Sequence, residues 1–191
     1  MRFFLTMSLF AALTGSFNVC AFAQEKGTVV NIETSLGNIK VELNDGAAPI
    51  SVKNFLSYVD DKFYDGTIFH RVIADFMIQG GGFIPGMKQK EPKGNIKNES
   101  FNKLTNLRGT IAMARTPDPD SASSQFFINV KDNGFLDKAN SGDGFGYCVF
   151  GKVIDGMDVV DKIRKVETSA QRQMKDIPTK DVVIKSVTRV K

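Results

Sequence analysis

Apolar and polar residues alternate along many short stretches of this 191-residue chain, which is the pattern of strands with one buried face. Clusters of Gly, Pro, Asn, Asp and Ser separate the stretches and supply turns. The pattern predicts eight strands, at residues 28–34, 38–43, 67–73, 76–79, 109–114, 125–130, 147–153 and 181–190. The first two flank the turn Ser35-Leu36-Gly37 and form a predicted hairpin.

Two further stretches carry apolar residues at helical spacing. Pro49 suits a first helical turn and opens a predicted helix over residues 50–60, and a second helix is predicted over 157–165. Core packing explains both apolar stripes, which consist of Ile50, Phe55, Leu56 and Val59 in the first helix and Val159, Val160, Ile163 and Val166 in the second. No linker or internal repeat divides the chain. One closed or nearly closed antiparallel sheet with two helices is therefore the predicted fold.

The first 23 residues differ from the rest of the chain. A positively charged start precedes a short apolar run, and Ala21-Phe22-Ala23 forms a small-residue cleavage motif. Because the run is too short to span a bilayer, residues 1–23 are predicted to be a secretory signal peptide and residues 24–191 the mature domain. A buried N-terminal helix and a lipoprotein anchored at Cys20 are the alternatives. Export would place the protein in the periplasm or, as a second destination, outside the cell.

Composition and charge narrow the class of protein. Hydrophobic residues make up 42% of the chain and charged residues 24%, as in soluble globular proteins, and no membrane span is expected. Without the leader, 168 residues remain, and their net charge of +3 is spread along the chain. A nucleic-acid partner is therefore not expected. Cys148 is then the single cysteine, which excludes an internal disulfide and, beside an apolar run, predicts a buried and inert thiol.

The sequence lacks the residues that most kinds of catalysis require. His70 is the single histidine, and it shares a strand face with Ile68 and Val72, which predicts a structural histidine packed inward. A Ser-His-Asp or Cys-His hydrolase would need that ring exposed beside a nucleophile. One histidine and one cysteine cannot supply a zinc site, and the glycines at 80–82 match neither dinucleotide nor P-loop spacing. We therefore expect no metal and no cofactor.

Polar side chains set among apolar ones form the remaining candidate site. Alternation places Phe69, Arg71 and Ile73 on one strand face, Met77 with Gln79 on a second, and Gln125 with Phe127 on a third. Taken singly, these residues have ordinary explanations, a solvated arginine and apolar core side chains. Taken together, they predict an apolar pocket with a guanidinium and amides at its rim.

Five motifs resemble, in this order, those of the cyclophilins, the cyclosporin-type peptidyl-prolyl isomerases. They are FHRVIADFMIQGGG at 69–82, GTIAMAR at 109–115, SQFFINV at 124–130, GFLD at 134–137 and VFGKVIDGMDVVDKI at 149–163. The resemblance covers nearly all of the chain after the leader and, with that leader, is strongest to exported bacterial members. It implies a mainly β fold, a closed eight-stranded antiparallel β-barrel with two capping α-helices. It also implies acceleration of rotation about X-Pro bonds, here in exported proteins that are folding.

The resemblance also implies roles for individual residues. Arg71 would be the catalytic arginine. The proline pocket would be lined by Phe76, Met77, Phe127 and Leu136, the substrate backbone would be held by Gln79 and Gln125, and the groove would be bordered by Ala114 and, through its backbone, Arg115. Phe135 and Tyr147 occupy binding positions where many eukaryotic members carry Trp and His.

Phe135 is a departure with a chemical consequence. In the family the indole N–H of tryptophan donates to cyclosporin, and a phenyl ring has no donor, so weak cyclosporin binding with retained isomerase activity is expected. The implied partners are proline-containing polypeptides and unfolded exported proteins, bound by a monomer. An alternative stays open, a proline-binding chaperone or adhesion module that uses the same groove and whose isomerase activity is incidental.

Overall fold

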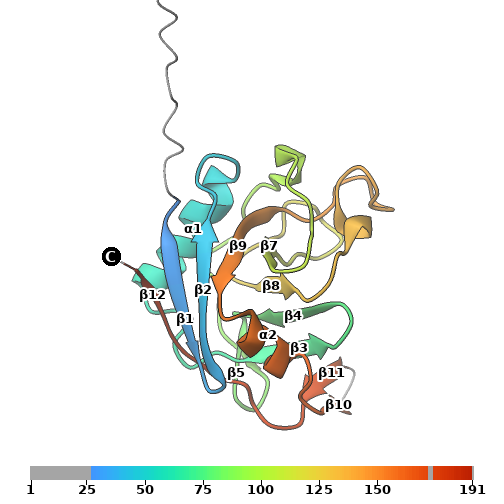
Figure 1. The fold of residues 1–191 in the computed structure, drawn as a ribbon. Coiled ribbons are helices and arrows are strands. Elements are labelled where there is room, and N and C mark those ends of the chain that lie inside the picture. The colour runs from blue at the N-terminus through green and yellow to red at the C-terminus, as the bar shows by residue number, and fades with distance from the viewer. Residues whose placement is uncertain (1–26, 172–173, 191) are drawn as a thin grey trace, which may run out of the picture.

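Eight strands form one antiparallel sheet that curls strongly on itself (Figure 1). The computed structural model describes residues 27–171 and 174–190, so the predicted signal peptide and its cleavage site lie outside the described residues. The strands are Val29–Thr34 (β1), Gly37–Leu43 (β2), Phe69–Ile73 (β3), Met77–Gly80 (β4), Thr110–Met113 (β7), Phe126–Asn129 (β8), Val149–Asp155 (β9) and Ile184–Arg189 (β12). Their order in the sheet is β12-β1-β2-β9-β7-β8-β4-β3. All eight predicted strands are confirmed, with boundaries that differ by a few residues.

The two edge strands of the sheet, β12 and β3, meet only near their beginnings. Ile68 and Val183 form an isolated bridge, and beside it the Phe69 N–H donates to the Val182 carbonyl over 2.9 Å. β3 also lies against β11 (Met174–Pro178). The expected full closure of the barrel is therefore slightly overstated, because the segment before β12 packs on β3 where a closing strand would pair.

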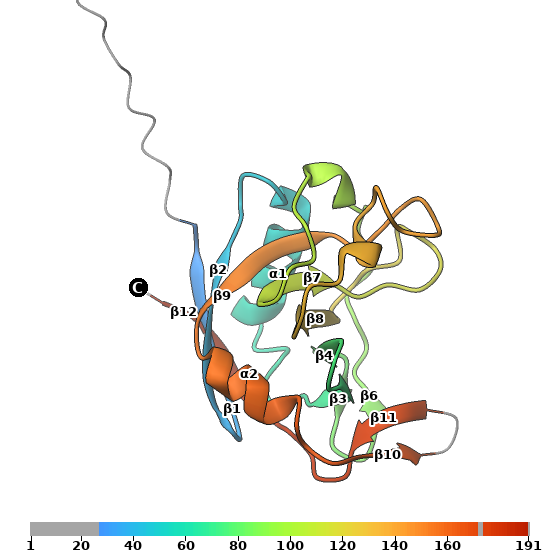
Figure 2. The same ribbon diagram turned by 45° about the vertical axis from the view of Figure 1, so that its right-hand side comes forward.

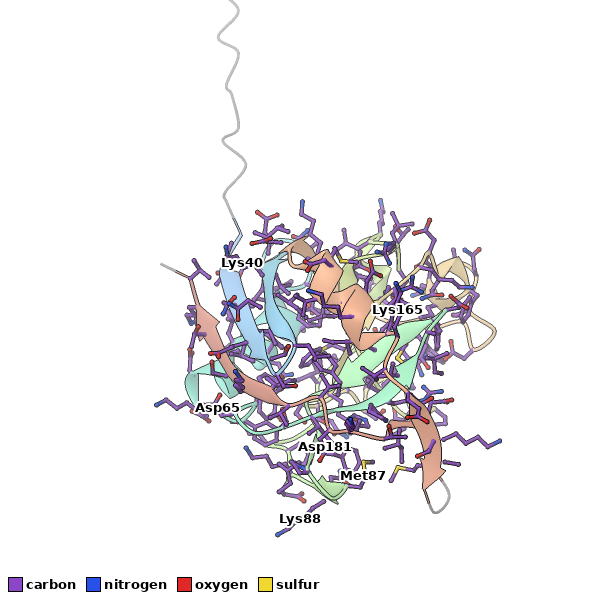
Figure 3. The ribbon with its side chains drawn as sticks, turned by 60° about the horizontal axis from the view of Figure 1, so that its bottom comes forward. Lys40, Asp65, Met87, Lys88, Lys165 and Asp181 are labelled. Atoms are coloured by element: carbon purple, nitrogen blue, oxygen red, sulfur yellow. The ribbon has the colours of Figure 1, made fainter. Side chains whose placement is uncertain are left out.

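Two short hairpins stand outside this sheet and were not predicted. One pairs β5 (Phe83–Ile84) with β6 (Lys88–Gln89), and the other pairs β10 (Thr168–Gln171) with β11. Strands as short as β5 and β6 show no period in the sequence. Met87 and Lys88 mark the turn end of the first hairpin at the rim of the molecule (Figure 3).

Two helices, α1 (Pro49–Asp60) and α2 (Met157–Ile163), pack on the curled sheet (Figure 2). α1 contacts β12 and α2 contacts β2. The interior core contains Val52, Phe55, Leu56, Tyr58 and Val59 from α1, and Val159, Val160 and Ile163 from α2. Both predicted helices are confirmed. Ile50 is an exception to the predicted stripe because its side chain is 43% exposed in the first turn.

The long loop over residues 80–108 is fastened to both ends of α1. At the start of the helix, the buried carboxylate of Glu99 accepts hydrogen bonds from the backbone N–H groups of Ile50 (3.0 Å) and Ser51 (2.8 Å). Near the end of the helix, the Lys93 ammonium donates to the Ser57 carbonyl over 3.1 Å. Helix ends leave such backbone groups without partners, so these contacts stabilise the helix and anchor the loop.

A β-bulge at His70 decides which side chains of β3 face outward. Phe69 and Arg71 pair with consecutive residues of β4, so β3 carries one extra residue here. Phe69 consequently belongs to the interior core, while Ile73 packs on the opposite face of the sheet. The sequence-based placement of Phe69 on one face with Arg71 and Ile73 is wrong, because the extra residue shifts the alternation.

Candidate active site

A second apolar cluster lies on the outer face of the sheet, apart from the interior core. Strand alternation separates the two, since Phe126 and Ile128 of β8 belong to the interior core and Phe127 to the outer cluster. The buried members are Met77, Ala112, Phe127, Leu136 and Val149, and Ile73, Phe76, Leu104, Ala114 and Tyr147 pack against them. We call this set the outer apolar cluster. It brings together most of the apolar residues that the sequence predicts for the site.

The polar site residues join this cluster through the register of the strands. Arg71 pairs with Gln79, Gln79 with Phe127, and Phe127 with Ala112. Directly opposed residues of neighbouring strands project on the same face of a sheet. These four side chains therefore form one row across β3, β4, β8 and β7, with the arginine at the edge strand and the apolar cluster beside it.

Arg71 stands at the end of this row with an uncommitted guanidinium. Its side chain is half-buried, and within residues 27–171 and 174–190 no hydrogen bond or ion pair engages it. By contrast, Arg108, Arg115, Arg164 and Arg189 each pair with a carboxylate. The rigid fork of N–H donors on Arg71 is therefore available to a ligand bound on the apolar cluster.

The two predicted glutamines contact each other. Gln79 Nε2 donates to Gln125 Oε1 over 2.9 Å. Gly82 lies directly against Gln125, because a Cβ at this glycine would come within 2.5 Å of the glutamine Cγ. The glycine at position 82 therefore makes room for the Gln125 side chain. This packing explains one glycine of the GGG motif, and phosphate binding is not needed to explain it.

His70 is buried, as predicted, with 5% of its surface exposed. Its ring packs on Phe83 with the centroids 4.6 Å apart. Burial lowers the pKa of His70 from 6.5 to about 4, and the nearby positive charge of Arg71 also lowers it. Nδ1 has no hydrogen-bond partner among the described residues, so no carboxylate orients the ring as in a catalytic triad. The histidine is a neutral neighbour of Gln125, and the hydrolase hypothesis is excluded.

Aromatic rings form the walls of the outer apolar cluster. Phe135 stacks on Phe76 with centroids 5.5 Å apart and planes inclined by 28°. Tyr147 meets the Phe127 ring edge to face at 5.8 Å. Phe135 follows Gly134 in the short 3-10 helix η2 (Gly134–Leu136) and is 57% exposed, so it covers the cluster from the solvent side.

Ala114 belongs to the outer apolar cluster, whereas the Arg115 side chain serves the fold. That side chain is 2% exposed, pairs with Asp143 and donates from Nε to the Gly146 carbonyl over 3.0 Å. Its guanidinium carbon lies 4.4 Å from the centroid of the Tyr147 ring. The hydrogen bond from Arg115 lowers the pKa of Asp143 well below its usual range. This arrangement leaves only the backbone of Arg115 for a ligand, which is the part that the sequence predicts to be used.

Sequence reasoning missed three asparagines beside this site. Asn106, Asn129 and Asn133 are fully buried and hydrogen-bonded to one another. The available signal was the same as for Gln125, since Asn129 is a polar residue within the apolar motif SQFFINV. In the pairing of β4 with β8, Asn129 lies directly opposite Met77.

The remaining features of the described surface point to no other centre. A hollow of about 1080 Å³ lies over β2, β9 and β7 and adjoins the outer apolar cluster through Val149 and Leu104. Within the described ranges, no three His, Cys, Asp or Glu side chains gather where a metal ion could bind. No helix in this part of the chain is long and apolar enough to cross a membrane. Cys148 is buried, and burial raises the pKa of its thiol to about 11, which agrees with the predicted inert cysteine.

Known proteins have similar sequences over almost the whole described part of this chain. Residues 29–189 match the family described as cyclophilin type peptidyl-prolyl cis-trans isomerase/CLD. The chain belongs to this family. Peptidyl-prolyl cis-trans isomerase A of Dickeya dadantii is 55% identical over 171 residues, which cover 90% of this chain and 89% of the relative. Peptidyl-prolyl cis-trans isomerase B of Escherichia coli is 57% identical over 161 residues, or 84% of this chain and 98% of the relative.

Solved cyclophilin structures share the fold. A crystal structure of a cyclophilin type isomerase from Cryptosporidium parvum superimposes with a TM-score of 0.72 at 28% identity and covers 86% of this chain and 98% of its own. A second structure of that protein, in the presence of the dipeptide Ala-Pro, gives the same TM-score and covers 85% of this chain. The protein is therefore a cyclophilin-type peptidyl-prolyl cis-trans isomerase. The family, the fold class and the reaction predicted from the five motifs are confirmed.

Proposed function

We propose that this cyclophilin binds proline-containing segments of polypeptides on the outer apolar cluster, and that Arg71 is its catalytic residue. The observation that carries the proposal is the row formed by Arg71, Gln79 and Phe127, in which an uncommitted guanidinium adjoins a buried apolar surface. The Cryptosporidium parvum relative, which has a crystal structure in the presence of the dipeptide Ala-Pro, supports this choice of substrate class.

The chemistry of prolyl rotation suits a guanidinium in this place. Amide resonance imposes a barrier of about 18–20 kcal/mol on the rotation. As the bond twists, the prolyl nitrogen loses conjugation, becomes pyramidal and gains a lone pair that an N–H of Arg71 can bind. The planar amide offers no such acceptor, so this hydrogen bond stabilises the transition state more than the bound substrate. The step requires no covalent intermediate.

Arg71 alone supplies only part of the acceleration. A hydrogen bond from a charged group contributes about 1.5–3 kcal/mol, whereas an acceleration of about a millionfold needs about 8 kcal/mol. We assign the remainder to the apolar surface, which disfavours the polar planar amide, and to Gln79 and Gln125, which hold the substrate backbone. Burial of the prolyl ring against Met77 and Phe127 anchors one side of the bond. This burial contributes about 0.8 kcal/mol of binding free energy per CH2 group.

A protease-coupled assay with an X-Pro peptide tests the role of Arg71. We expect Arg71→Ala to lower kcat/KM by about tenfold to a hundredfold, the equivalent of one charged hydrogen bond, with an unchanged melting temperature. Arg71→Lys should recover little of this loss, because an ammonium lacks the planar fork. Arg189→Ala is the matched control, since Arg189 lies on the opposite edge strand and pairs with Asp60. Turnover by Arg71→Ala equal to that of the control would refute the assignment.

We further propose that the clients are exported proteins folding in the periplasm. The support is the sequence of residues 1–23, with its charged start, short apolar run and Ala-Phe-Ala motif. Fractionation of cells that express the full chain, with N-terminal sequencing of the product, tests the proposal. A periplasmic product that begins at Gln24 is expected, and an uncleaved product in the cytoplasm would contradict it.

The chaperone or adhesion hypothesis remains the alternative for the cellular role. It predicts that binding of proline-containing segments suffices, so Arg71→Ala would retain the cellular effect while losing turnover. The isomerase hypothesis predicts that this variant loses both. A complementation experiment with Arg71→Ala, accompanied by a measurement of peptide binding, separates the two.

A further inference from the structure

A chain of three buried asparagines runs beside the outer apolar cluster. Asn106, Asn129 and Asn133 are each 0% exposed. Asn133 Nδ2 donates to Asn129 Oδ1 over 2.8 Å, and Asn129 Nδ2 donates to Asn106 Oδ1 over 3.2 Å. Asn129 Nδ2 also reaches the Thr110 hydroxyl at 2.9 Å. We call these residues the asparagine chain.

One end of the asparagine chain holds two walls of the site. Asn133 Nδ2 donates a second hydrogen bond to the Phe76 carbonyl over 2.8 Å. The Asn133 carbonyl accepts the N–H of Leu136 over 2.8 Å, and the Leu136 carbonyl in turn accepts the N–H of Tyr147 over 2.9 Å. A single residue therefore joins the turn that carries Phe76 to the helix η2 that carries Leu136.

The other end of the asparagine chain, Asn106, holds η2 through Asp137, the residue that follows this helix. The backbone N–H and the side-chain amide of Asn106 both donate to Asp137 Oδ1, over 2.7 and 2.9 Å. The Asn106 carbonyl accepts the N–H of Asn133 over 2.8 Å. In the middle, Asn129 pairs in register with Met77, a member of the outer apolar cluster. The floor and both walls of the site are thus tied to one hydrogen-bonded unit.

Buried amides of this kind contribute more to geometry than to stability. The net gain from a hydrogen bond between neutral groups is small, because the unfolded chain bonds to water instead. A network in which the donors have partners nevertheless restricts the arrangement of the segments that it joins. The four donors on the side chains of Asn129 and Asn133 all engage oxygens of neighbouring segments or of each other, whereas the buried Asn133 Oδ1 has no partner among the described residues.

We propose that Asn133, supported by Asn129, is a positioning residue that sets the spacing between Phe76 and Leu136, and thereby fits the site to the five-membered prolyl ring. The proposal rests on the proposed function, in which this ring binds on the outer apolar cluster. Asn133 touches no reacting atom. It determines which ring enters.

The structure indicates that this role can be separated from folding. In Asn133→Ala the hydrogen bonds made by the backbone of Asn133 to Leu136 and Asn106 remain, and the Phe76 carbonyl keeps its bond from the Val130 N–H at 3.1 Å. The variant loses the two side-chain hydrogen bonds that fix Phe76 to β8, and it leaves the buried Asn129 Oδ1 without its donor, which lowers the stability of the variant. Asn140→Ala is a matched control, because the Asn140 side chain donates to the Gly134 carbonyl of the same helix η2 over 3.0 Å but lies at the surface.

The test compares two peptides that differ only in ring size. One carries proline and the other carries pipecolic acid, whose ring has one more CH2. The isomerisation rate of each peptide is measured with the wild type, Asn133→Ala, Asn140→Ala and Arg71→Ala. We expect Asn133→Ala to lower kcat/KM for the prolyl peptide by about three- to tenfold, the equivalent of one neutral hydrogen bond. For the pipecolyl peptide we expect a smaller loss, so that the preference for proline falls.

Each result decides the proposal. Equal losses on both peptides, or unchanged rates, would overturn it, as would the same loss of preference in Asn140→Ala. Wild-type turnover by Arg71→Ala would instead show that the substrate does not bind on the outer apolar cluster, and Asn133 would then have no site to position. If Asn133→Ala does not fold, Asn133→Ser, which keeps one donor near Asn129, takes its place. Failure of both variants to fold would make Asn133 a structural residue and contradict the positioning role.

Discussion

Exchanging a single phenylalanine of β8 for leucine tests the division between the two faces of the sheet. Phe127 is 4% exposed in the outer apolar cluster, while its neighbour Phe126 is 0% exposed in the interior core. Phe127→Leu should weaken substrate binding and Phe126→Leu should not. The same substitution at adjacent positions thus serves as perturbation and control.

The expected rise in KM for Phe127→Leu follows from the burial of the prolyl ring. A prolyl ring carries three CH2 groups, and their burial contributes about 2.4 kcal/mol in total at about 0.8 kcal/mol each. Met77 and Phe127 share this contact, and leucine is too short to restore the share of the Phe127 ring, so about half of the burial would be lost. The lost half corresponds to about 1.2 kcal/mol, or about an eightfold rise in KM. Because Arg71 and Gln79 keep their places, kcat should change little.

The interior position has a different consequence. The Phe126 ring packs edge to face on Phe55 at 5.6 Å and on Tyr64 at 5.5 Å. Truncation of a buried phenylalanine to alanine costs about 3–5 kcal/mol, and leucine leaves a smaller cavity, so Phe126→Leu should lower the free energy of unfolding by about 1–2 kcal/mol. Per folded molecule, its kinetic constants should equal those of the wild type.

Kinetics and thermal unfolding of both variants, measured in parallel, supply the answer. The protease-coupled assay gives kcat and KM for an X-Pro peptide, and calorimetry gives the folded fraction at the assay temperature. An equal rise of KM in the two variants would refute the placement of the substrate on the outer face. A larger rise in Phe126→Leu would place the substrate elsewhere.

Two further predictions concern pH and drug binding. Because burial lowers the pKa of His70 from 6.5 to about 4, only the unfolded chain binds this proton between those values, and stability should fall by about 3 kcal/mol as the pH drops through that window. Urea unfolding between pH 4 and 7 should show that the free energy of unfolding depends less steeply on pH in His70→Gln than in the wild type. Equal slopes for the two proteins would contradict the burial effect. Phe135→Trp should tighten cyclosporin binding by about three- to tenfold, since Phe135 is 57% exposed and an indole there gains a donor. Calorimetric titration measures this change, and an affinity equal to that of the wild type would show that the missing donor is not the cause of weak binding.

Much of the candidate site could be predicted from local patterns. Alternation within MIQG and QFFIN placed Gln79 with Met77 and Gln125 with Phe127, because residues two apart in a strand share a face. The structure keeps Gln79 with Met77, since the register of β4 with β8 shows no bulge, and Gln125, which immediately precedes β8, contacts Gln79. The same reasoning failed at Phe69, where the bulge at His70 inverts the alternation. A bulge depends on the pairing partner, which alternation in one strand cannot show.

Other contacts join residues that are far apart in the chain. Glu99 meets the start of α1, Asn133 meets the Phe76 carbonyl, and the Arg115 side chain meets Asp143. Each of these side chains has an ordinary solvated alternative when the sequence is considered alone. Only the curled sheet, which brings the loops over residues 80–108 and 134–146 next to the strands, gives them partners.

The sequence by itself determined the eight strands of the main sheet, the two helices, the family and the residue types of the site, because alternation, helical spacing and motifs are local properties of the chain. The tertiary structure decided which edges of the sheet meet, which face each phenylalanine of β8 serves, and that Arg71 is left unpaired among the described residues while four other arginines are engaged. The physical reason is the same in each case. Burial and pairing depend on the neighbours that folding brings from distant parts of the chain, and a free donor beside a buried apolar surface exists only once those neighbours are in place.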